Sequence, residues 1–335
     1  MYNKPFIIAE AAQGYAPIIR SKPSLEIGIL LVRAAASAGA DAVKFQIIFV
    51  DELAEPGYEH YVLFKNLEMS TKEWMILREE ARRLSIEFHA DIFGLKSLDI
   101  AKKISVDGIK IHSTSFFDED LFKNALHLKK PIYISIGGIE FNELTDFITS
   151  NNLEEINAKI ILMHGFQSEP TPIENNNLAR ISELSRTTGL EIGFMDHADG
   201  GEDDFINISI MALANGVSYF EKHITLDREI ELEDFVSAIP PKKFANYVNT
   251  IKRLHSAVGK KSLNLTYREK KYRDGAVKKI IANKNIKKGK LIKKSDLTSM
   301  RRPNKNGFFN FSDVVGKQAL KDIKKGSLIN NILIK

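Results

Sequence analysis

Short apolar runs rich in β-branched residues alternate with stretches of helical periodicity over the first two thirds of the chain. Near-continuous hydrophobic runs are typical of strands buried on both faces, and their alternation with helices predicts parallel pairing. Eight runs fit this description: Pro5–Glu10, Asp41–Gln46, Ile86–Asp91, Gly108–Ser113, Pro131–Ile136, Lys159–His164, Glu191–Asp196 and Tyr219–Ile224. Eight such units in about 225 residues predict an α/β fold closed into a (β/α)₈ TIM barrel rather than an open doubly wound sheet.

Three helices of this barrel are marked by their sequence. Ser70 and Glu73 form a capping box ahead of Trp74–Leu84, because a serine and a glutamate three residues apart satisfy the free amides of a helix start. Ser24–Ala38 has apolar positions at helical spacing. A last helix is expected from about Pro241 to Val258.

A polar, charged stretch after this helix predicts a domain boundary. We expect a barrel over residues 1–260, a linker over 261–275 and a small module over 276–335. Within the module, Asn283–Ile292 and Leu320–Ile329 share an I-K-K-G-x-L-I core. The repeat predicts two related β-turn units and a compact β-rich fold.

Charge is divided unevenly between these parts. The chain has a formal charge of +5, but residues 276–335 carry 16 Lys and Arg against 3 Asp and Glu, or +13, which leaves −8 for residues 1–275. A basic module that docks on an acidic partner domain explains this asymmetry more readily than a polyanion-binding surface, since no nucleic-acid motif is present. We therefore expect no nucleic-acid partner.

Composition excludes several other classes of protein. The chain has no cysteine, which removes disulfides, thiolate metal sites and cysteine nucleophiles. No apolar run approaches the roughly 20 residues that span a bilayer, and the first ten residues lack the features of a secretion signal. A soluble cytoplasmic protein without a membrane partner is the expectation.

Polar residues are unusually frequent at the predicted carboxyl ends of the strands, where the active site of a parallel barrel lies. They are Glu10, Lys44, Gln46, His89, Asp91, Lys110, His112, Ser113, Ser135, His164, Asp196, His197, Glu221 and His223. A single histidine is more often a hydrogen-bonded structural residue than a functional one. Five of the eight histidines belong to this set, however, and buried polar groups are costly unless satisfied, so a functional cluster is expected.

Two of these histidines predict a metal site. His197 directly follows the seventh strand and His223 ends the eighth, so their imidazoles can meet over one divalent ion. Histidine nitrogens with open positions suit Mn²⁺, Fe²⁺, Co²⁺ or Zn²⁺. The alternative is a pair of rim histidines without a metal.

Two lysines predict an anionic substrate. Lys44 and Lys110 end the second and fourth strands and point at the same mouth, where their ammonium groups would repel each other unless an anion lay between them. This favours a substrate with a phosphate or carboxylate. The alternatives are that each lysine pairs with one of the rim carboxylates, or that one forms a Schiff base. The carboxylates concerned are Glu10, Asp91 and Glu221.

Several longer motifs resemble those of the sialic acid synthase family, over nearly the whole chain. They are I-I-A-E at Ile7–Glu10, A-G-A-D-A-V-K-F-Q at Ala38–Gln46, P-T-P at Pro170–Pro172, D-H at Asp196–His197 and E-K-H-x-T-L-D-R at Glu221–Arg228. The C-terminal module resembles the family's antifreeze-like (SAF) domain, through R-R-P at Arg301–Pro303 and the pattern at Gly316–Gly326. The resemblance implies a transferase that condenses phosphoenolpyruvate with an N-acylated hexosamine to give a nonulosonic acid.

The resemblance also implies roles for individual residues. His197 and His223 would hold a divalent metal, Mn²⁺ first with Mg²⁺ or Co²⁺ as alternatives, that polarises the sugar aldehyde. Glu10 would act on the water that adds to phosphoenolpyruvate. Lys44, Lys110, Ser113 and Ser135 would bind phosphoenolpyruvate, and Gln46, Glu221 and Asp234 would orient the sugar and metal-bound groups. In a domain-swapped homodimer, Arg302 would reach the barrel of the other subunit.

Some positions depart from the family pattern. Asp91 replaces a hydroxyl residue that helps to bind phosphoenolpyruvate, and Gln167 stands where the family has an asparagine. Met195 replaces a serine before the D-H motif. The acidic loop that contains Asp234 is closer to synthases of pseudaminic-type diamino sugars. The expected acceptor is N-acetylmannosamine or a diacetamido-hexose.

Two rival functions remain open at this point. A related metal-dependent aldolase or isomerase on the same barrel would turn over a sugar without phosphoenolpyruvate, which the missing phosphate-side donors favour. A catalytically silent homologue would bind a sugar or another chain through the basic module. Alanine substitution of Glu10 or His197 distinguishes an enzyme from a silent homologue. An enzyme should lose its activity, whereas a silent homologue should keep its cellular phenotype.

Overall fold

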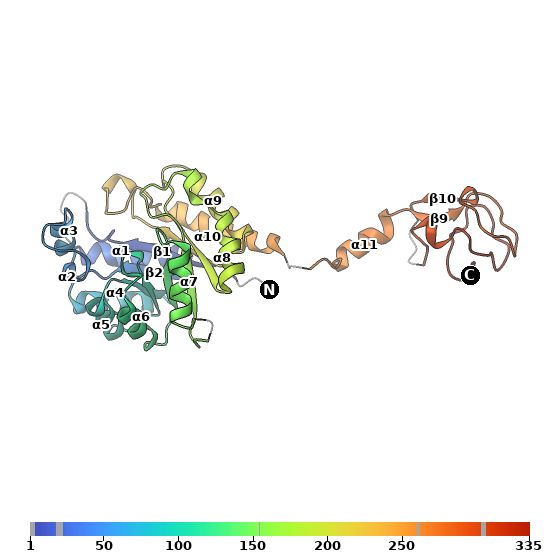
Figure 1. Ribbon diagram of the computed structural model, residues 1–335. Helices are drawn as coiled ribbons and strands as arrows, with labels where there is room; N and C mark the ends of the chain where they lie inside the picture. The colour runs from blue at the N-terminus through green and yellow to red at the C-terminus, as the bar shows by residue number, and fades with distance from the viewer. Residues whose placement is uncertain (1–3, 18–22, 154, 260–261, 303–305) are drawn as a thin grey trace. The chain divides into compact units, whose positions relative to one another are not determined.

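The structure is a computed structural model that describes residues 4–17, 23–153, 155–259, 262–302 and 306–335. The chain divides into two compact units, Met1–Lys260 and Lys261–Lys335 (Figure 1). No helix in the described ranges is both long and apolar enough to cross a membrane.

The first unit is the predicted TIM barrel. Eight parallel strands pair in sequence order, and the first also pairs with the eighth, which closes the sheet. The strands are β1 (Phe6–Ala12), β2 (Ala42–Gln46), β3 (Glu87–Ile92), β4 (Gly108–Ile111), β5 (Ile132–Ser135), β6 (Ile160–His164), β7 (Glu191–Asp196) and β8 (Tyr219–His223). Each lies within, or within two residues of, a predicted run.

Helices cover the outside of the barrel, as Figure 1 shows for most of them. They are α1 (Leu25–Ser37), α2 (Val50–Leu53), α3 (Tyr61–Asn66), α4 (Thr71–Arg83), α5 (Leu95–Lys103), α6 (Glu119–Leu126), α7 (Phe141–Ser150), α8 (Ala179–Thr188), α9 (Asp204–Ala214) and α10 (Pro241–Val258). The capping box of α4 is confirmed, since the Ser70 hydroxyl accepts from the Glu73 amide and the Glu73 carboxylate accepts from the Ser70 amide. Proline opens α10, where its missing amide costs nothing.

The two faces of the strands are packed differently, because successive side chains point to opposite sides of a sheet. Outward residues form the large apolar core against the helices, including Phe45, which contacts Trp74 and Phe88. Inward residues fill only the lower part of the barrel with an apolar cluster, which contains Tyr133, Met163 and Tyr219 among others. Above that cluster the inward positions become polar, and the candidate site lies there.

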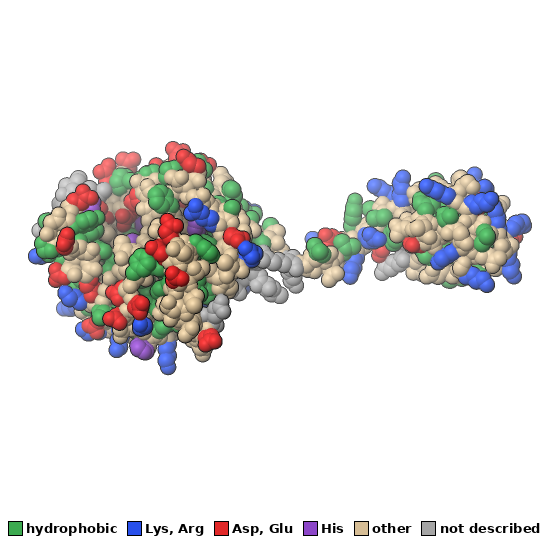
Figure 2. Space-filling model, viewed as in Figure 1, with side chains coloured by type: hydrophobic (Ala, Val, Ile, Leu, Met, Phe, Trp, Pro, Cys, Tyr) green, Lys and Arg blue, Asp and Glu red, His purple; other side chains and the backbone are tan. Residues whose placement is uncertain are grey.

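The second unit begins with helix α11 (Tyr267–Ala276), which starts inside the predicted linker, ends one residue beyond it and is capped by Thr266 and Glu269. The rest is β-rich. Strand β9 (Lys279–Ala282) pairs antiparallel with β10 (Leu297–Met300) over a core of isoleucine, leucine, valine and alanine. Lysine and arginine side chains are scattered over the visible face of this unit, with few acidic side chains among them (Figure 2).

The internal repeat of the second unit forms two equivalent turns. Ile286 and Ile323 exchange both backbone hydrogen bonds at 2.8 Å. The Asp322 carboxylate accepts from the Lys288 amide in one turn, and the Asn285 side-chain oxygen accepts from the Lys325 amide in the other, each at 2.8 Å. Gly289 and Gly326 complete the turns at φ values of +84° and +82°, where side chains are disfavoured.

Candidate active site

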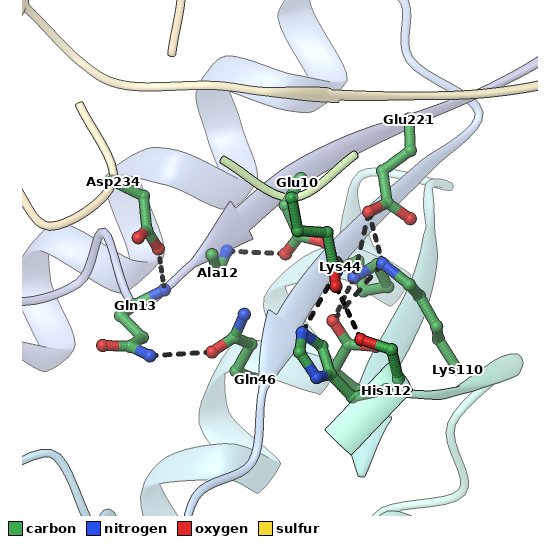
Figure 3. A network of polar contacts seen from close by, with 12 residues as sticks. Glu10, Ala12, Gln13, Lys44, Gln46, Lys110, His112, Glu221 and Asp234 are labelled. Carbon is green, nitrogen blue, oxygen red and sulfur yellow. Dashed lines mark hydrogen bonds and ion pairs between the residues drawn. The ribbon is translucent and has the colours of Figure 1, made fainter. Parts of the chain in front are cut away.

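Five charged side chains meet inside the barrel above the apolar cluster, and four of them are labelled in Figure 3. Lys44 Nζ lies 2.5 Å from Asp91 Oδ2 and 3.6 Å from Glu221 Oε1, and it also contacts Glu10 Oε2. Lys110 Nζ lies 2.6 Å from Glu221 Oε1 and 3.8 Å from Asp91 Oδ2. None of the five side chains is more than 2% exposed. We call these residues the ion-pair cluster.

The ion-pair cluster corrects the argument for an anion. Without nearby acids, Lys44 and Lys110 would need a bound anion, but three carboxylates surround the two ammonium groups and give a formal charge of −1. The alternative in which each lysine pairs with a rim carboxylate is therefore correct for the protein alone. Burial lowers the pKa of Lys44 despite the opposing carboxylates. Burial also acts to lower the pKa of Lys110, but Asp91 and Glu221 outweigh it and the pKa is raised.

His197 and His223 lie together, as expected from neighbouring strands. Their ring centroids are 5.1 Å apart, and His197 and His223 are 7% and 5% exposed. Burial lowers the pKa of His197 to about 3, with a further contribution from Lys110, and it holds the pKa of His223 well below its usual value. Both imidazoles are thus neutral near pH 7, which is the form that binds metal.

These two imidazoles fit a divalent ion with open coordination positions. The Nδ1 atom of His197 is buried and has no hydrogen-bond partner among the described residues. In the part of the chain that the structure describes, no three or more histidine or acidic side chains are grouped so that they could hold a metal ion. The protein therefore offers an imidazole pair, and water or substrate would supply the other ligands.

A second buried ion pair lies behind the two histidines and was not predicted. Lys222 Nζ is 3.2 Å from Asp196 Oδ1 and 2.8 Å from the Ala198 carbonyl oxygen. The Ser209 hydroxyl lies 3.3 Å from Asp196 Oδ2 and 3.1 Å from the Tyr247 hydroxyl. This network links β7 and β8 to helices α9 and α10.

The sequence contained a signal for this pair. Asp196 and Lys222 are register partners on β7 and β8. Each directly precedes one of the paired histidines, so the alternation of strand side chains sends the charges outward and the imidazoles inward. The pair thereby holds the two strands in the register that brings His197 and His223 together.

Two of the five histidines expected at the mouth lie elsewhere. His89 points into the barrel but one layer lower, where it stacks on Phe6 at 5.8 Å and bonds Glu87 at 2.8 Å. His164 points outward, and its Nε2 lies 3.0 Å from the Asn176 carbonyl oxygen. The expectation of a five-histidine cluster was wrong, because strand position alone fixes neither the face nor the depth of a side chain.

The remaining predicted residues of the barrel occupy its mouth in two groups. On one side, the Gln13 side-chain Nε2 donates to Gln46 Oε1 at 2.8 Å, and the Gln13 backbone amide donates to Asp234 Oδ2 at 3.3 Å (Figure 3). On the other side, Ser113 donates to Gln167 Oε1 at 2.7 Å, and Gln167 Nε2 lies 3.1 Å from His112 Nε2.

Two predicted residues stand apart from these contacts. Ser135 is fully buried, and its hydroxyl has no hydrogen-bond partner among the described residues. Arg302 belongs to the second unit, where its exposed guanidinium donates to the Gly326 carbonyl oxygen. Pro303, the last residue of the R-R-P motif, lies outside the described residues.

Comparison with known proteins places this geometry in one class of barrel enzyme. The solved sialic acid synthetase of Leptospira borgpetersenii has a TM-score of 0.73 and 28% identity, over 82% of this chain and 93% of that one. The N,N'-diacetyllegionaminic acid synthase of Campylobacter jejuni is 27% identical over 98% of this chain and 99% of its own length. An uncharacterized protein of Methanocaldococcus jannaschii is 30% identical over 96% and 91%.

Two segments of the chain match known sequence families. Residues 31–263 match the NeuB family, and residues 278–331 match the SAF domain. The chain belongs to the NeuB family. It is accordingly an enzyme of the transferase class, like the sialic-acid-type synthases among its relatives.

Proposed function

We propose that this enzyme condenses phosphoenolpyruvate with an N-acylated aldohexose and releases a nonulosonic acid and phosphate. One observation carries the proposal. The imidazoles of His197 and His223 face the same interior as Glu10 and the two lysines, so a divalent ion and an anionic substrate would have groups to bind them in one site. Membership of the NeuB family supports the reaction class.

The proposed reaction forms one bond between carbons. Carbon three of phosphoenolpyruvate attacks the aldehyde carbon of the open-chain sugar, and its second carbon becomes an oxocarbenium centre. Water adds to that centre, and the C–O bond to phosphate then breaks to leave a keto group. The two protons of the water end on the new hydroxyl and on the phosphate.

The residues of the site have separate tasks in this proposal. A divalent ion bound by His197 and His223, Mn²⁺ first, would polarise the aldehyde oxygen. Glu10 accepts a proton from the attacking water, and the Ala12 amide orients its carboxylate through a 2.8 Å hydrogen bond. Lys44 and Lys110 bind the anionic groups of phosphoenolpyruvate.

The neutral side chains complete the two substrate sites. Ser113, Ser135 and Gln167 donate to phosphoenolpyruvate, which gives the buried Ser135 hydroxyl a partner. Gln46, Glu221 and Asp234 orient the sugar. The acceptor is a diacetamido-hexose or N-acetylmannosamine, and the diacetylated product in the name of the Campylobacter relative favours the first.

The reaction is tested with purified protein, Mn²⁺, phosphoenolpyruvate and a panel of N-acyl hexoses. Phosphate release should require all three components, and mass spectrometry of the product should show the sugar enlarged by a three-carbon acid. E10Q should reduce kcat by about a hundredfold or more, whereas E26Q on the exposed face of α1 should not. Sugar turnover without phosphoenolpyruvate would instead establish the aldolase or isomerase function.

We further propose a domain-swapped homodimer in which Arg302 of one copy binds the N-acyl group in the barrel of the other. The opposite charges of residues 1–275 and 276–335 support such docking. R302A and H197A should each be inactive alone. A mixture that exchanges subunits should recover activity, because some mixed dimers contain one intact site. Recovery would be absent if Arg302 acted on its own barrel.

A further inference from the structure

Asp91 occupies the place between the two lysines of the ion-pair cluster. Its Oδ2 atom is 2.5 Å from Lys44 Nζ and 3.8 Å from Lys110 Nζ. The side chain is 1% exposed, and its Oδ1 atom has no hydrogen-bond partner among the described residues. A carboxylate that faces two ammonium groups in this way has the same charge and contacts as a substrate anion would have there.

The charges of the ion-pair cluster leave no lysine free for an incoming anion. Glu10 contacts Lys44, and Glu221 lies 2.6 Å from Lys110, so each ammonium group already has a carboxylate besides Asp91. The formal charge of −1 would become more negative if phosphate entered. In a buried site this repulsion is weakly screened. Two acids lie within 4 Å of both lysines: Glu221 is closer to Lys110, and Asp91 is closer to Lys44.

We propose that Asp91 is a specificity-determining residue, an internal counter-anion that competes with the anionic group of the first substrate for Lys44 and Lys110. It keeps small anions, including the phosphate released by the reaction, out of the lysine pair. Only a substrate with further contacts in the pocket displaces it. This inference rests on the proposed function for the identity of the substrate, but the competition itself is a property of the empty site.

Calorimetric titration with inorganic phosphate and with phosphoenolpyruvate, without an acceptor sugar, tests the competition. D91N and D91T remove the charge while they keep a polar side chain, and D91T restores the hydroxyl that the resemblance places here. Each should bind both anions at least about tenfold more tightly than the wild type, because one negative charge within 4 Å of the lysines is lost. The KM for phosphoenolpyruvate should fall in parallel, and the KM for the sugar should not.

D99N is the matched control, since Asp99 pairs with Lys103 at 2.6 Å on the exposed surface of α5. It should bind both anions as the wild type does. Circular dichroism and melting curves establish that each variant is folded, and the two variants differ in size so that either one can serve. Folded D91N or D91T with unchanged or weaker anion binding would overturn the inference, and a purely structural Asp91 would give that result.

The effect of the Asp91 variants on anion binding is tested separately from the proposed reaction. If the variants bind phosphate more tightly but no sugar is ever converted, the proposed function fails and the role of Asp91 stands. If the sugar is converted but the anion affinities do not change, the reaction stands and the role of Asp91 fails.

Discussion

Removal of one partner from the buried ion pair of Asp196 and Lys222 should destabilise the barrel strongly. In K222M the Asp196 carboxylate stays buried, with only the Ala198 amide at 2.9 Å and the Ser209 hydroxyl at 3.3 Å to satisfy it. Breaking a buried pair in this way costs about 3–5 kcal/mol. For a domain of this size that corresponds to a fall in Tm of roughly 6–20 °C.

Lys243 provides a matched control for this substitution. It pairs with Asp203 at 3.2 Å and lies over the same Phe205 ring as Lys222, but its side chain is 40% exposed. Surface pairs contribute about 0–1 kcal/mol, so K243M should be nearly neutral. The double variant D196N/K222M should recover much of the stability lost in K222M, because no buried charge is left without a partner.

Urea unfolding followed by tryptophan fluorescence measures these effects. The chain has one tryptophan, Trp74, which is buried between α4 and the barrel strands, so its signal reports on the first unit. K222M should also bind Mn²⁺ more weakly, because the strand register that brings the histidines together is loosened. The reasoning is refuted if K222M is no less stable than K243M, or if the double variant is less stable than K222M.

Three further outcomes are expected. H197A and H223A should each lower Mn²⁺ affinity by about tenfold or more, measured by electron paramagnetic resonance of free Mn²⁺. H164A should not lower it, because His164 points away from the barrel interior. Equal losses of affinity in all three variants would contradict the proposed metal site. G193A should cost about 1–3 kcal/mol in urea unfolding, since a Cβ there would lie 2.3 Å from the Met163 sulfur, whereas G275A in α11 meets no atom within 4 Å and should leave barrel stability unchanged. In the second unit, hydrogen bonds from Lys284 and from the Lys293 amide hold the pKa of Asp296 well below its usual range. The stabilisation by this carboxylate is therefore complete above the unfolded-state pKa of about 3.9 and is lost as the pH falls below that value. Hydrogen exchange of the β9 amides should be faster in D296N than in the wild type at pH 7. The difference between the two proteins should shrink towards pH 2.

The barrel could be predicted from the sequence because parallel strands buried on both faces leave a pattern that does not depend on distant residues. Each strand overlaps its predicted run, with ends shifted by at most two residues. The capping box at Ser70 and Glu73 was equally local. The helix inside the predicted linker was missed, although Thr266 and Glu269 form the same kind of capping box.

The site could be predicted only in part. That His197 and His223 approach each other follows from two neighbouring strands that end at the same edge, which the order of the motifs already implied. Their role as metal ligands, and the roles of the other predicted site residues, stay predictions. The placement of His89 and His164 was wrong because a strand end contains both inward and outward positions.

By itself, the sequence determined which segments become strands and helices, and hence which side chains reach the mouth of the barrel. Only the tertiary structure decided how the charges there are balanced. Lys44 and Asp91 are 47 residues apart, and Lys110 and Glu221 are 111 apart, yet each pair is in contact. Whether a buried ammonium group meets a carboxylate or awaits a substrate depends on ångström-scale distances across the closed sheet, because interactions between charges are strong at short range in a medium of low polarity. A hydrophobic pattern along the chain contains no such distances.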